Sequence, residues 1–190
     1  QLDYLIEHFA KRPLSKLDFE VLQILRLGAY QLLHLDRVPA AAAVNDAVAM
    51  TRRARKTSAA GLVNAVLRGL SRNAHRLPLP LRPPEGDPLS YLEVSLSHPR
   101  WLANRWLGRY GFEAAEAWEK FNNAPAPLTI RVNRLKIDAG ALTRALSGHG
   151  VTVEPARYAP DGLIVTAGNP LRTPLAGTGQ FFLQDEASQL

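Results

Sequence analysis

Helical spacing of apolar residues dominates the first part of the chain. Apolar side chains recur at intervals of three and four residues over residues 2–9, 15–34, 39–55 and 58–74, which is the pattern of amphipathic helices. The second segment is apolar around more than half of its circumference, and this predicts a central and largely buried helix. The pattern therefore predicts a tightly packed helical bundle over residues 1–76.

The pattern changes after residue 76. Residues 77–88 are rich in proline and predict an extended linker with neither helix nor strand. Residues 99–110 and 113–122 predict two amphipathic helices, whose tryptophans we expect in a core. Alternation and turn residues then predict strands at 128–133, 151–155, 162–166 and 179–184, a helix at 139–147, and the start of an unpartnered helix at 185–190. The expected fold class is multidomain, with an all-α bundle followed by a small helical plus α+β domain.

Charge is distributed unevenly between these two parts. Residues 1–76 hold 12 Lys and Arg against 6 Asp and Glu, whereas residues 77–190 hold 11 of each. A basic helical segment favours a polyanionic partner such as a nucleic acid. The chain has no cysteine, so disulfides, thiolate metal sites and a cysteine nucleophile are excluded within it, and its scattered histidines predict no metal site.

Six basic residues are candidate phosphate contacts. Four of them lie at the end of the third predicted helix and the start of the next, and two lie four residues apart on the fourth. If the two groups converge, they form a strip that contacts several phosphates; the alternative is a solvated cationic helix end. The candidates are Arg52, Arg53, Arg55, Lys56, Arg68 and Arg72.

The first predicted strand of the second part carries two further candidates. Arg131 and Asn133 share one face of this strand, while Ile130 and Val132 face the expected core. A guanidinium and an amide side by side can hold a phosphate and a base edge. They can equally fix a neighbouring loop through hydrogen bonds, and both interpretations stay open.

Several motifs together carry a family resemblance. They are QLDYLI (1–6), LGAYQLL (27–33), RVPAAAAVNDAV (37–48), GLVNAVLR (61–68), HPRWL (98–102), the run from Asn122 to Asn133, and FFLQDEASQL (181–190). The first four resemble the NusB-like domain at the N-terminus of bacterial ribosomal RNA cytosine-5 methyltransferases of the RsmB (Sun, Fmu) type. The others are similar to the same family in order and rough spacing.

This resemblance implies that the parent enzyme methylates C5 of a cytosine in 16S ribosomal RNA with S-adenosylmethionine. In the family, the cofactor loop and the two catalytic cysteines follow the QDEAS motif, so we expect this chain to be a fragment without catalytic or cofactor residues. The implied domains are a NusB-like RNA-binding domain (1–76), a linker (77–88), a helical connector with a ferredoxin-like unit (89–183), and the start of the methyltransferase domain (184–190).

Two other functions remain open at this point. A stand-alone NusB-like transcription antitermination factor would bind RNA without any enzymatic role, although the residues beyond the bundle argue against it. Alternatively, the bundle is a protein-interaction domain that orients the catalytic part. No stretch approaches the ~20 apolar residues needed to span a bilayer, and we expect a cytoplasmic monomer.

Overall fold

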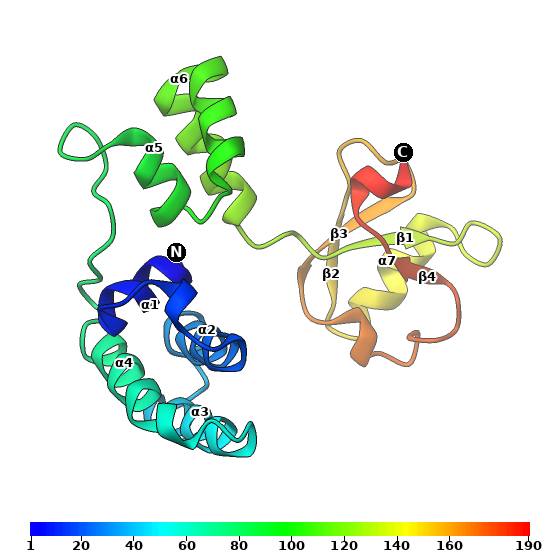
Figure 1. The fold of residues 1–190 in the computed structure, drawn as a ribbon. Coiled ribbons are helices and arrows are strands. Elements are labelled where there is room, and N and C mark those ends of the chain that lie inside the picture. Colours follow the sequence, from blue (N-terminus) through cyan, green and yellow to red (C-terminus); the bar gives the residue numbers. More distant parts are fainter. The chain divides into compact units, whose positions relative to one another are not determined.

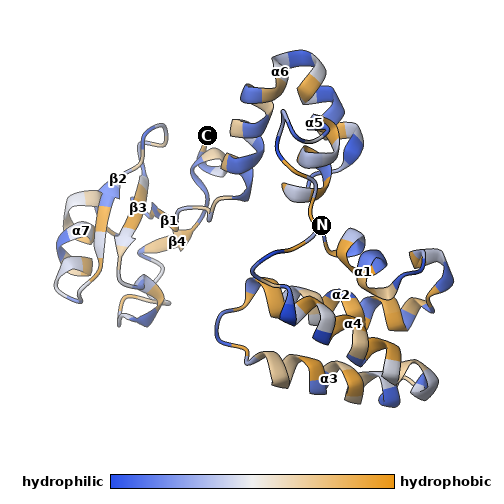
Figure 2. Cartoon of the chain, turned by 90° about the vertical axis from the view of Figure 1, so that its left-hand side faces the viewer, coloured by the Kyte–Doolittle hydropathy of each residue, from blue (hydrophilic) through white to orange (hydrophobic).

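In the computed structural model, which describes residues 1–190, four helices enclose the first hydrophobic core. The helices α1 (Leu2–Ala10), α2 (Phe19–His34), α3 (Ala40–Arg53) and α4 (Ala60–Arg72) are drawn from blue to blue-green in Figure 1. Their apolar faces turn toward one another (Figure 2), because helical spacing gathers apolar side chains on one side of each helix, mainly Leu, Ile and Val in α1, α2 and α4 and mainly Ala in α3. Both α2 and α4 pack against the other three helices. The predicted bundle is thus present.

The helix α2 is less buried than the breadth of its apolar surface predicts. Its buried face includes Leu25, Gly28 and Ala29, but Leu27 is 46% exposed and Tyr30 is 47% exposed. Only three neighbouring helices are available to cover it, so α2 is amphipathic rather than buried all round. Short 3-10 turns connect the bundle, namely η1 (Leu14–Lys16) before α2 and η2 (Thr57–Ala59) before α4.

A smaller helical cluster follows the bundle within the same compact unit, which runs from Gln1 to Asn123. It consists of α5 (Pro88–Ser90), the π-helical turn η3 (Tyr91–Ser95) and α6 (Arg100–Asn123). Leu92, Ala103 and Ala115 are its buried centre. Gly111 breaks α6 with a φ of 77°, a left-handed conformation that glycine adopts readily, so the two helices predicted here meet at this residue.

The proline-rich segment is tied to α6 rather than free. Arg82 donates from Nε to Glu116 Oε1 and from Nη2 to Glu116 Oε2, both at 2.9 Å, and its Nη2 also reaches Glu113 Oε2 at 2.9 Å. Ser95 Oγ donates to the carbonyl of Pro80 at 2.8 Å. Residues 77–87 form neither helix nor strand, as expected, but their polar contacts attach them to the helical cluster.

The expectation that the tryptophans lie in a core is wrong for two of the three. Trp101 is 66% exposed and Trp118 is 51% exposed, and Phe121 next to Trp118 is 70% exposed. The second half of α6 instead turns Glu116 and Glu119 inward, and these are only 5% and 0% exposed. Hydrogen bonds from a distant segment to Glu116 fix this face, which a hydrophobicity pattern does not reveal.

The second compact unit, Ala124–Leu190, contains a four-stranded sheet. The strands β1 (Thr129–Val132), β2 (Thr152–Pro155), β3 (Gly162–Ala167) and β4 (Phe181–Leu183) lie in the order β2-β3-β1-β4, and every pairing is antiparallel. The helix α7 (Ala139–Ser147) contributes Leu142 and Leu146 to a core with the apolar face of the sheet. A 3-10 turn, η4 (Pro170–Arg172), stands between β3 and β4. This is the expected helical plus α+β arrangement.

The last residues correct another expectation. They form a 3-10 turn, η5 (Glu186–Gln189), instead of the start of an unpartnered α-helix. The carboxylate of Glu186 accepts the backbone N–H of Ala159 at 2.9 Å and that of Tyr158. The segment therefore has hydrogen-bond partners in the turn between β2 and β3. These partners bind the carboxylate of Glu186, which the sequence predicts at the start of a helix.

Candidate nucleic-acid interface

The six cationic candidates of the bundle form two groups at opposite ends of the α3–α4 hairpin. Arg52 and Arg53 end α3, while Arg55, with a φ of 60°, and Lys56 belong to the connection that leads into α4. Arg68 lies eight residues into α4, roughly 12 Å along its axis from Ala60 at about 1.5 Å per residue. The hairpin therefore separates the groups, so they do not converge into the single strip that was one of the two alternatives.

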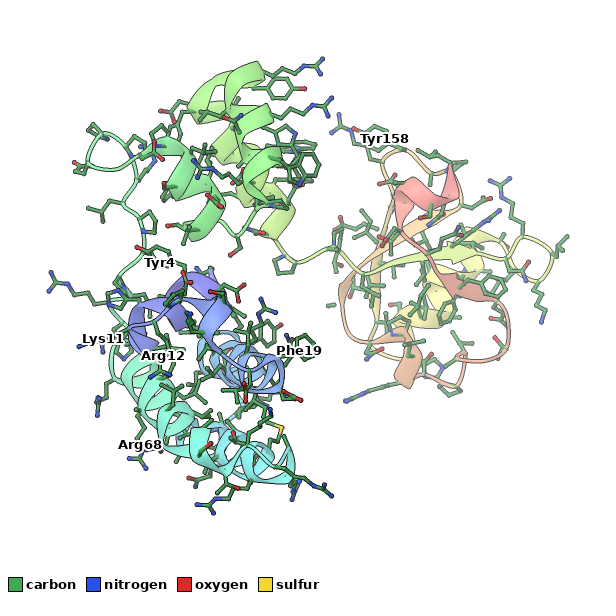
Figure 3. The ribbon with its side chains drawn as sticks, in the orientation of Figure 1. Tyr4, Lys11, Arg12, Phe19, Arg68 and Tyr158 are labelled. Atoms are coloured by element: carbon green, nitrogen blue, oxygen red, sulfur yellow. The ribbon has the colours of Figure 1, made fainter.

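Arg68 and Arg72 border a hollow between the end of α4 and the start of α3. The hollow has a volume of about 260 Å³, and Ala40, Asn45 and Ser71 are among its other lining residues. Arg68 Nε donates to Asn64 Oδ1 at 2.9 Å, which leaves the remaining guanidinium donors facing solvent. Figure 3 shows Arg68 pointing away from the bundle. Guanidinium groups in such an exposed position suit phosphate oxygens, which they can bind through two parallel hydrogen bonds.

Lys56 differs from the other five candidates because it has acidic partners inside the protein. Its Nζ lies 2.9 Å from Asp18 Oδ2 and 3.6 Å from Glu20 Oε2, at the start of α2. The hydrogen bond to Asp18 and the two carboxylate charges raise the pKa of Lys56 above its usual value. These contacts favour a structural role, in which Lys56 fastens the α3–α4 connection to α2.

Pairing within the bundle leaves most of its positive charge unmatched. Of the 12 Lys and Arg in residues 1–76, Arg26 pairs with Asp3 at 2.6 Å and Lys56 pairs as described above. The other ten have no carboxylate within 4.0 Å of their side-chain nitrogens, whereas three of the six carboxylates are used in these pairs. The surface of the bundle therefore carries a large excess of free cations, which attracts polyanions over distances of about 10 Å at moderate salt.

The two candidates on β1 have different surroundings. Asn133 Nδ2 donates to the carbonyl of Gly179 at 2.7 Å, and Asn133 Oδ1 accepts the N–H of Leu135 at 3.2 Å. These bonds close the loop after β1 against the turn before β4, which favours the structural interpretation of Asn133. Arg131 is exposed, and its one side-chain hydrogen bond is a long one, 3.5 Å, to Gln184 Oε1. Its guanidinium thus has no carboxylate partner.

Sequence reasoning missed an aromatic side chain beside Arg131. Phe182 lies directly opposite Arg131 in the β1–β4 pairing and is 55% exposed, whereas Phe181 is 8% exposed and joins the core. The signal was present in the sequence, because two consecutive phenylalanines in a strand point to opposite faces. One of them therefore had to lie on the face that α7 does not cover.

Two carboxylates on the inner face of α6 have opposite electrostatic environments. Hydrogen bonds from Arg82, followed by those from Lys120 and Tyr91, lower the pKa of Glu116 to about 2. Burial raises the pKa of Glu119 to about 7, and neither of its oxygens has a hydrogen-bond partner. His98 Nδ1 lies 3.5 Å from Glu119 Oε2 but only 2.8 Å from the carbonyl of Leu96. Because the Nδ1–H of His98 donates to the carbonyl of Leu96, Glu119 has no strong hydrogen-bond donor beside it.

Comparison with known proteins gives two family matches. Residues 1–72 match the NusB family, and residues 98–172 match the Methyltr_RsmF/B-like, ferredoxin-like domain. The chain is 34% identical over 189 residues to the "Probable ribosomal RNA small subunit methyltransferase B" of Bacillus subtilis (strain 168), covering 100% of this chain and 41% of that protein. It is also 34% identical over 191 residues to the "Ribosomal RNA small subunit methyltransferase B" of Pseudomonas putida, covering 100% of this chain and 42% of that protein.

A solved structure shares the fold. The structure titled "Crystal Structure of PH0851" superimposes with a TM-score of 0.67 at 20% sequence identity, and the match covers 98% of this chain and 41% of that one. The chain thus spans about two fifths of the length of the proteins that it matches. None of its helices combines the length and the apolar character needed to cross a bilayer.

Proposed function

The chain carries the N-terminal NusB and ferredoxin-like domains of RsmB-type ribosomal RNA methyltransferases, and we propose that these domains dock 16S ribosomal RNA for methylation of a cytosine at C5. The observation that carries the proposal is the excess of cations in the bundle, ten of which have no carboxylate partner. Free cations on a rigid helical hairpin bind RNA phosphates and release the counterions that surround them. Such contacts position the RNA without reading its sequence.

Within this proposal, the two ends of the α3–α4 hairpin contact separate parts of the RNA backbone. Arg52, Arg53 and Arg55 form one contact region, and Arg68 and Arg72 form the other. Arg131 provides a further contact on the ferredoxin-like unit, while Lys56 and Asn133 act through the internal bonds described above. The proposed domain division is a NusB-like domain (1–76), a linker (77–88), a connector with the ferredoxin-like unit (89–183), and the start of the methyltransferase domain (184–190).

We infer that S-adenosylmethionine binds outside the residues of this chain. Open α/β folds bind nucleotides in a crevice at the carboxyl ends of parallel strands, whereas every strand pairing here is antiparallel. The Gly-Thr-Gly sequence at 177–179 lies in a turn between η4 and β4, not between a strand and a following helix. We therefore assign cofactor binding and methyl transfer to the part of the relatives that this chain does not cover.

A stand-alone antitermination factor is the weaker alternative. It would account for the NusB match over residues 1–72 but would leave the ferredoxin-like match over residues 98–172 without a role. A methyltransferase accounts for both. The third possibility, a bundle that binds only protein, gives no reason for exposed arginines without acidic partners at both ends of one hairpin.

Mobility-shift titrations with a hairpin from 16S ribosomal RNA test the proposal. The double variants Arg52→Ala/Arg53→Ala and Arg68→Ala/Arg72→Ala should each weaken binding, because each removes phosphate contacts at one end of the hairpin. The matched control is Arg144→Ala/Arg172→Ala, which removes two exposed arginines from the second unit. Equal losses in the control and in both test variants would show that only total charge matters, and unchanged binding in both test variants would refute the proposed contacts.

A further inference from the structure

A hollow at one end of the sheet combines aromatic, apolar and cationic side chains. Its volume is about 680 Å³, and its walls come from the end of β1, the loop to α7, and β4. Arg131, Leu135, Phe182 and Gln184 are among the residues that line it. A space of this size suits a small organic ligand or one unit of a polymer. The hollow lies entirely within the second compact unit.

The aromatic wall of the hollow is accessible. Phe182 is 55% exposed and stands on the sheet face opposite α7, whereas the adjacent Phe181 is buried in the core. Leu135, in the loop after β1, is 95% exposed. An exposed phenyl ring beside an apolar side chain makes no hydrogen bonds with water. It offers a flat surface on which a nucleobase can stack.

One cation of the hollow is free and the other is not. Arg131 has no carboxylate within 4.0 Å, and its approach to Gln184 Oε1 is long, at 3.5 Å. Arg134, in the same wall, pairs with Asp161. Since Arg131 faces Phe182 across the β1–β4 pairing, a stacking surface and a free guanidinium lie side by side.

We propose that this hollow binds an unpaired nucleotide of RNA, with its base stacked on Phe182 and an adjacent phosphate held by Arg131. The proposal rests on the proposed function, that the chain docks ribosomal RNA, and adds a site for single-stranded RNA to it. A base within a duplex is stacked on its neighbours and does not present a face to a protein ring, so the site selects loops, bulges and ends. An aromatic ring beside a cation is the arrangement that binds single-stranded nucleic acids with little sequence preference.

A protein partner is the competing occupant, because β4 is an edge strand and Leu183 on it is 47% exposed. The free guanidinium of Arg131 favours RNA, since a phosphate complements it and an apolar protein surface does not. A conservative substitution separates the two occupants. A leucine at position 182 keeps an apolar side chain for protein contact but removes the aromatic face that a base requires.

Fluorescence anisotropy on the whole 190-residue chain tests the proposal, with a fluorescein-labelled, non-self-complementary ten-nucleotide RNA as the probe and the same RNA in a duplex for comparison. Phe182→Leu should raise the Kd for the single strand by about five-fold to one-hundred-fold, the range for loss of one stacking contact. The Kd of Phe182→Tyr for the single strand should stay within about two-fold of that of the unsubstituted chain. Leu171→Ala, which alters an exposed apolar residue outside the hollow, is the matched control. Amide hydrogen exchange checks that each variant is folded.

Salt dependence then distinguishes stacking from charge. Phe182→Leu should leave the slope of log Kd against log salt unchanged, whereas Arg131→Ala should reduce it by about 0.7. An unchanged Kd in Phe182→Leu, or an equal loss of affinity for the duplex and the single strand, overturns the stacking site. The contacts of the bundle are still tested independently by Arg68→Ala/Arg72→Ala. Absence of any RNA binding by the unsubstituted chain overturns the proposed function together with this site.

Discussion

Replacement of Glu119 by Gln should stabilise the helical cluster at neutral and alkaline pH. Glu119 is fully buried, its oxygens have no hydrogen-bond partner, and burial raises its pKa from 4.5 to about 7. Well below pH 4.5 the carboxyl is protonated in both the folded and the unfolded chain, so its titration has no effect on stability. As the pH rises from 4.5 to 7, the unfolded chain loses this proton first, and the folded state is progressively penalised.

The size of the stability penalty follows from the shift in the pKa of Glu119. A difference of one pKa unit corresponds to about 1.4 kcal/mol, so a rise from 4.5 to about 7 amounts to roughly 3 kcal/mol above pH 7. Glutamine occupies almost the same volume and does not titrate. Glu119→Gln should therefore unfold with a free energy roughly 2–3 kcal/mol higher than the unsubstituted chain at pH 8, and with little difference at pH 4.

The tryptophans provide a local probe for this measurement. All three, Trp101, Trp106 and Trp118, lie on α6, so urea denaturation followed by their fluorescence reports on the helical cluster and not on the sheet. Glu113→Gln, on the same helix but at a carboxylate that is 80% exposed, is the control and should change stability by less than about 1 kcal/mol. Parallel curves of stability against pH for Glu119→Gln and the unsubstituted chain would refute the burial argument.

Three further outcomes follow from the polar contacts. Arg82→Ala should lower the urea midpoint of tryptophan fluorescence more than Arg109→Ala does, because it removes the guanidinium that forms two hydrogen bonds with Glu116. This loss of stability should shrink on acidification toward pH 2, because Glu116 then becomes protonated. Asn133→Ala should speed amide exchange in β1 and β4 by roughly 5- to 30-fold, equivalent to 1–2 kcal/mol for two lost hydrogen bonds, with exchange in α1–α4 unchanged as the control. Lys56→Ala should speed exchange at the start of α2 while leaving the salt dependence of RNA binding unchanged, and a reduced slope would contradict its structural role.

The sequence was most informative where apolar spacing alone determines the structure. The bundle and the strands lie close to where the pattern places them, because α1–α4 bury apolar faces, and because Ile130 and Val132 of β1 enter the core while Arg131 between them is exposed. The orientation of α6 could not be predicted in this way. Its inner face holds Glu116 and Glu119, and the guanidinium that neutralises Glu116 comes from Arg82, 34 residues earlier.

The candidate site was predictable in its charge but not in its geometry. The cationic excess of residues 1–76 is evident from the sequence, yet only the antiparallel hairpin shows that Arg52 and Arg68 lie at different ends. Lys56 and Asn133 looked like ligand-binding residues because their partners, Asp18 and Gly179, are remote in sequence. Strand alternation places one of the two consecutive phenylalanines, Phe181 and Phe182, on the outer face, but only the pairing with β1 shows that Phe182 lies beside Arg131.

Salt titration of RNA affinity tests the central claim most directly. If the free arginines of the α3–α4 hairpin bind phosphates, the affinity of the chain for a 16S-derived hairpin falls steeply with salt, and the slope decreases by up to about 0.9 for each contact removed. The account predicts a much flatter slope when Arg52, Arg53, Arg68 and Arg72 are all replaced by alanine. An unchanged slope and affinity in that variant would contradict it.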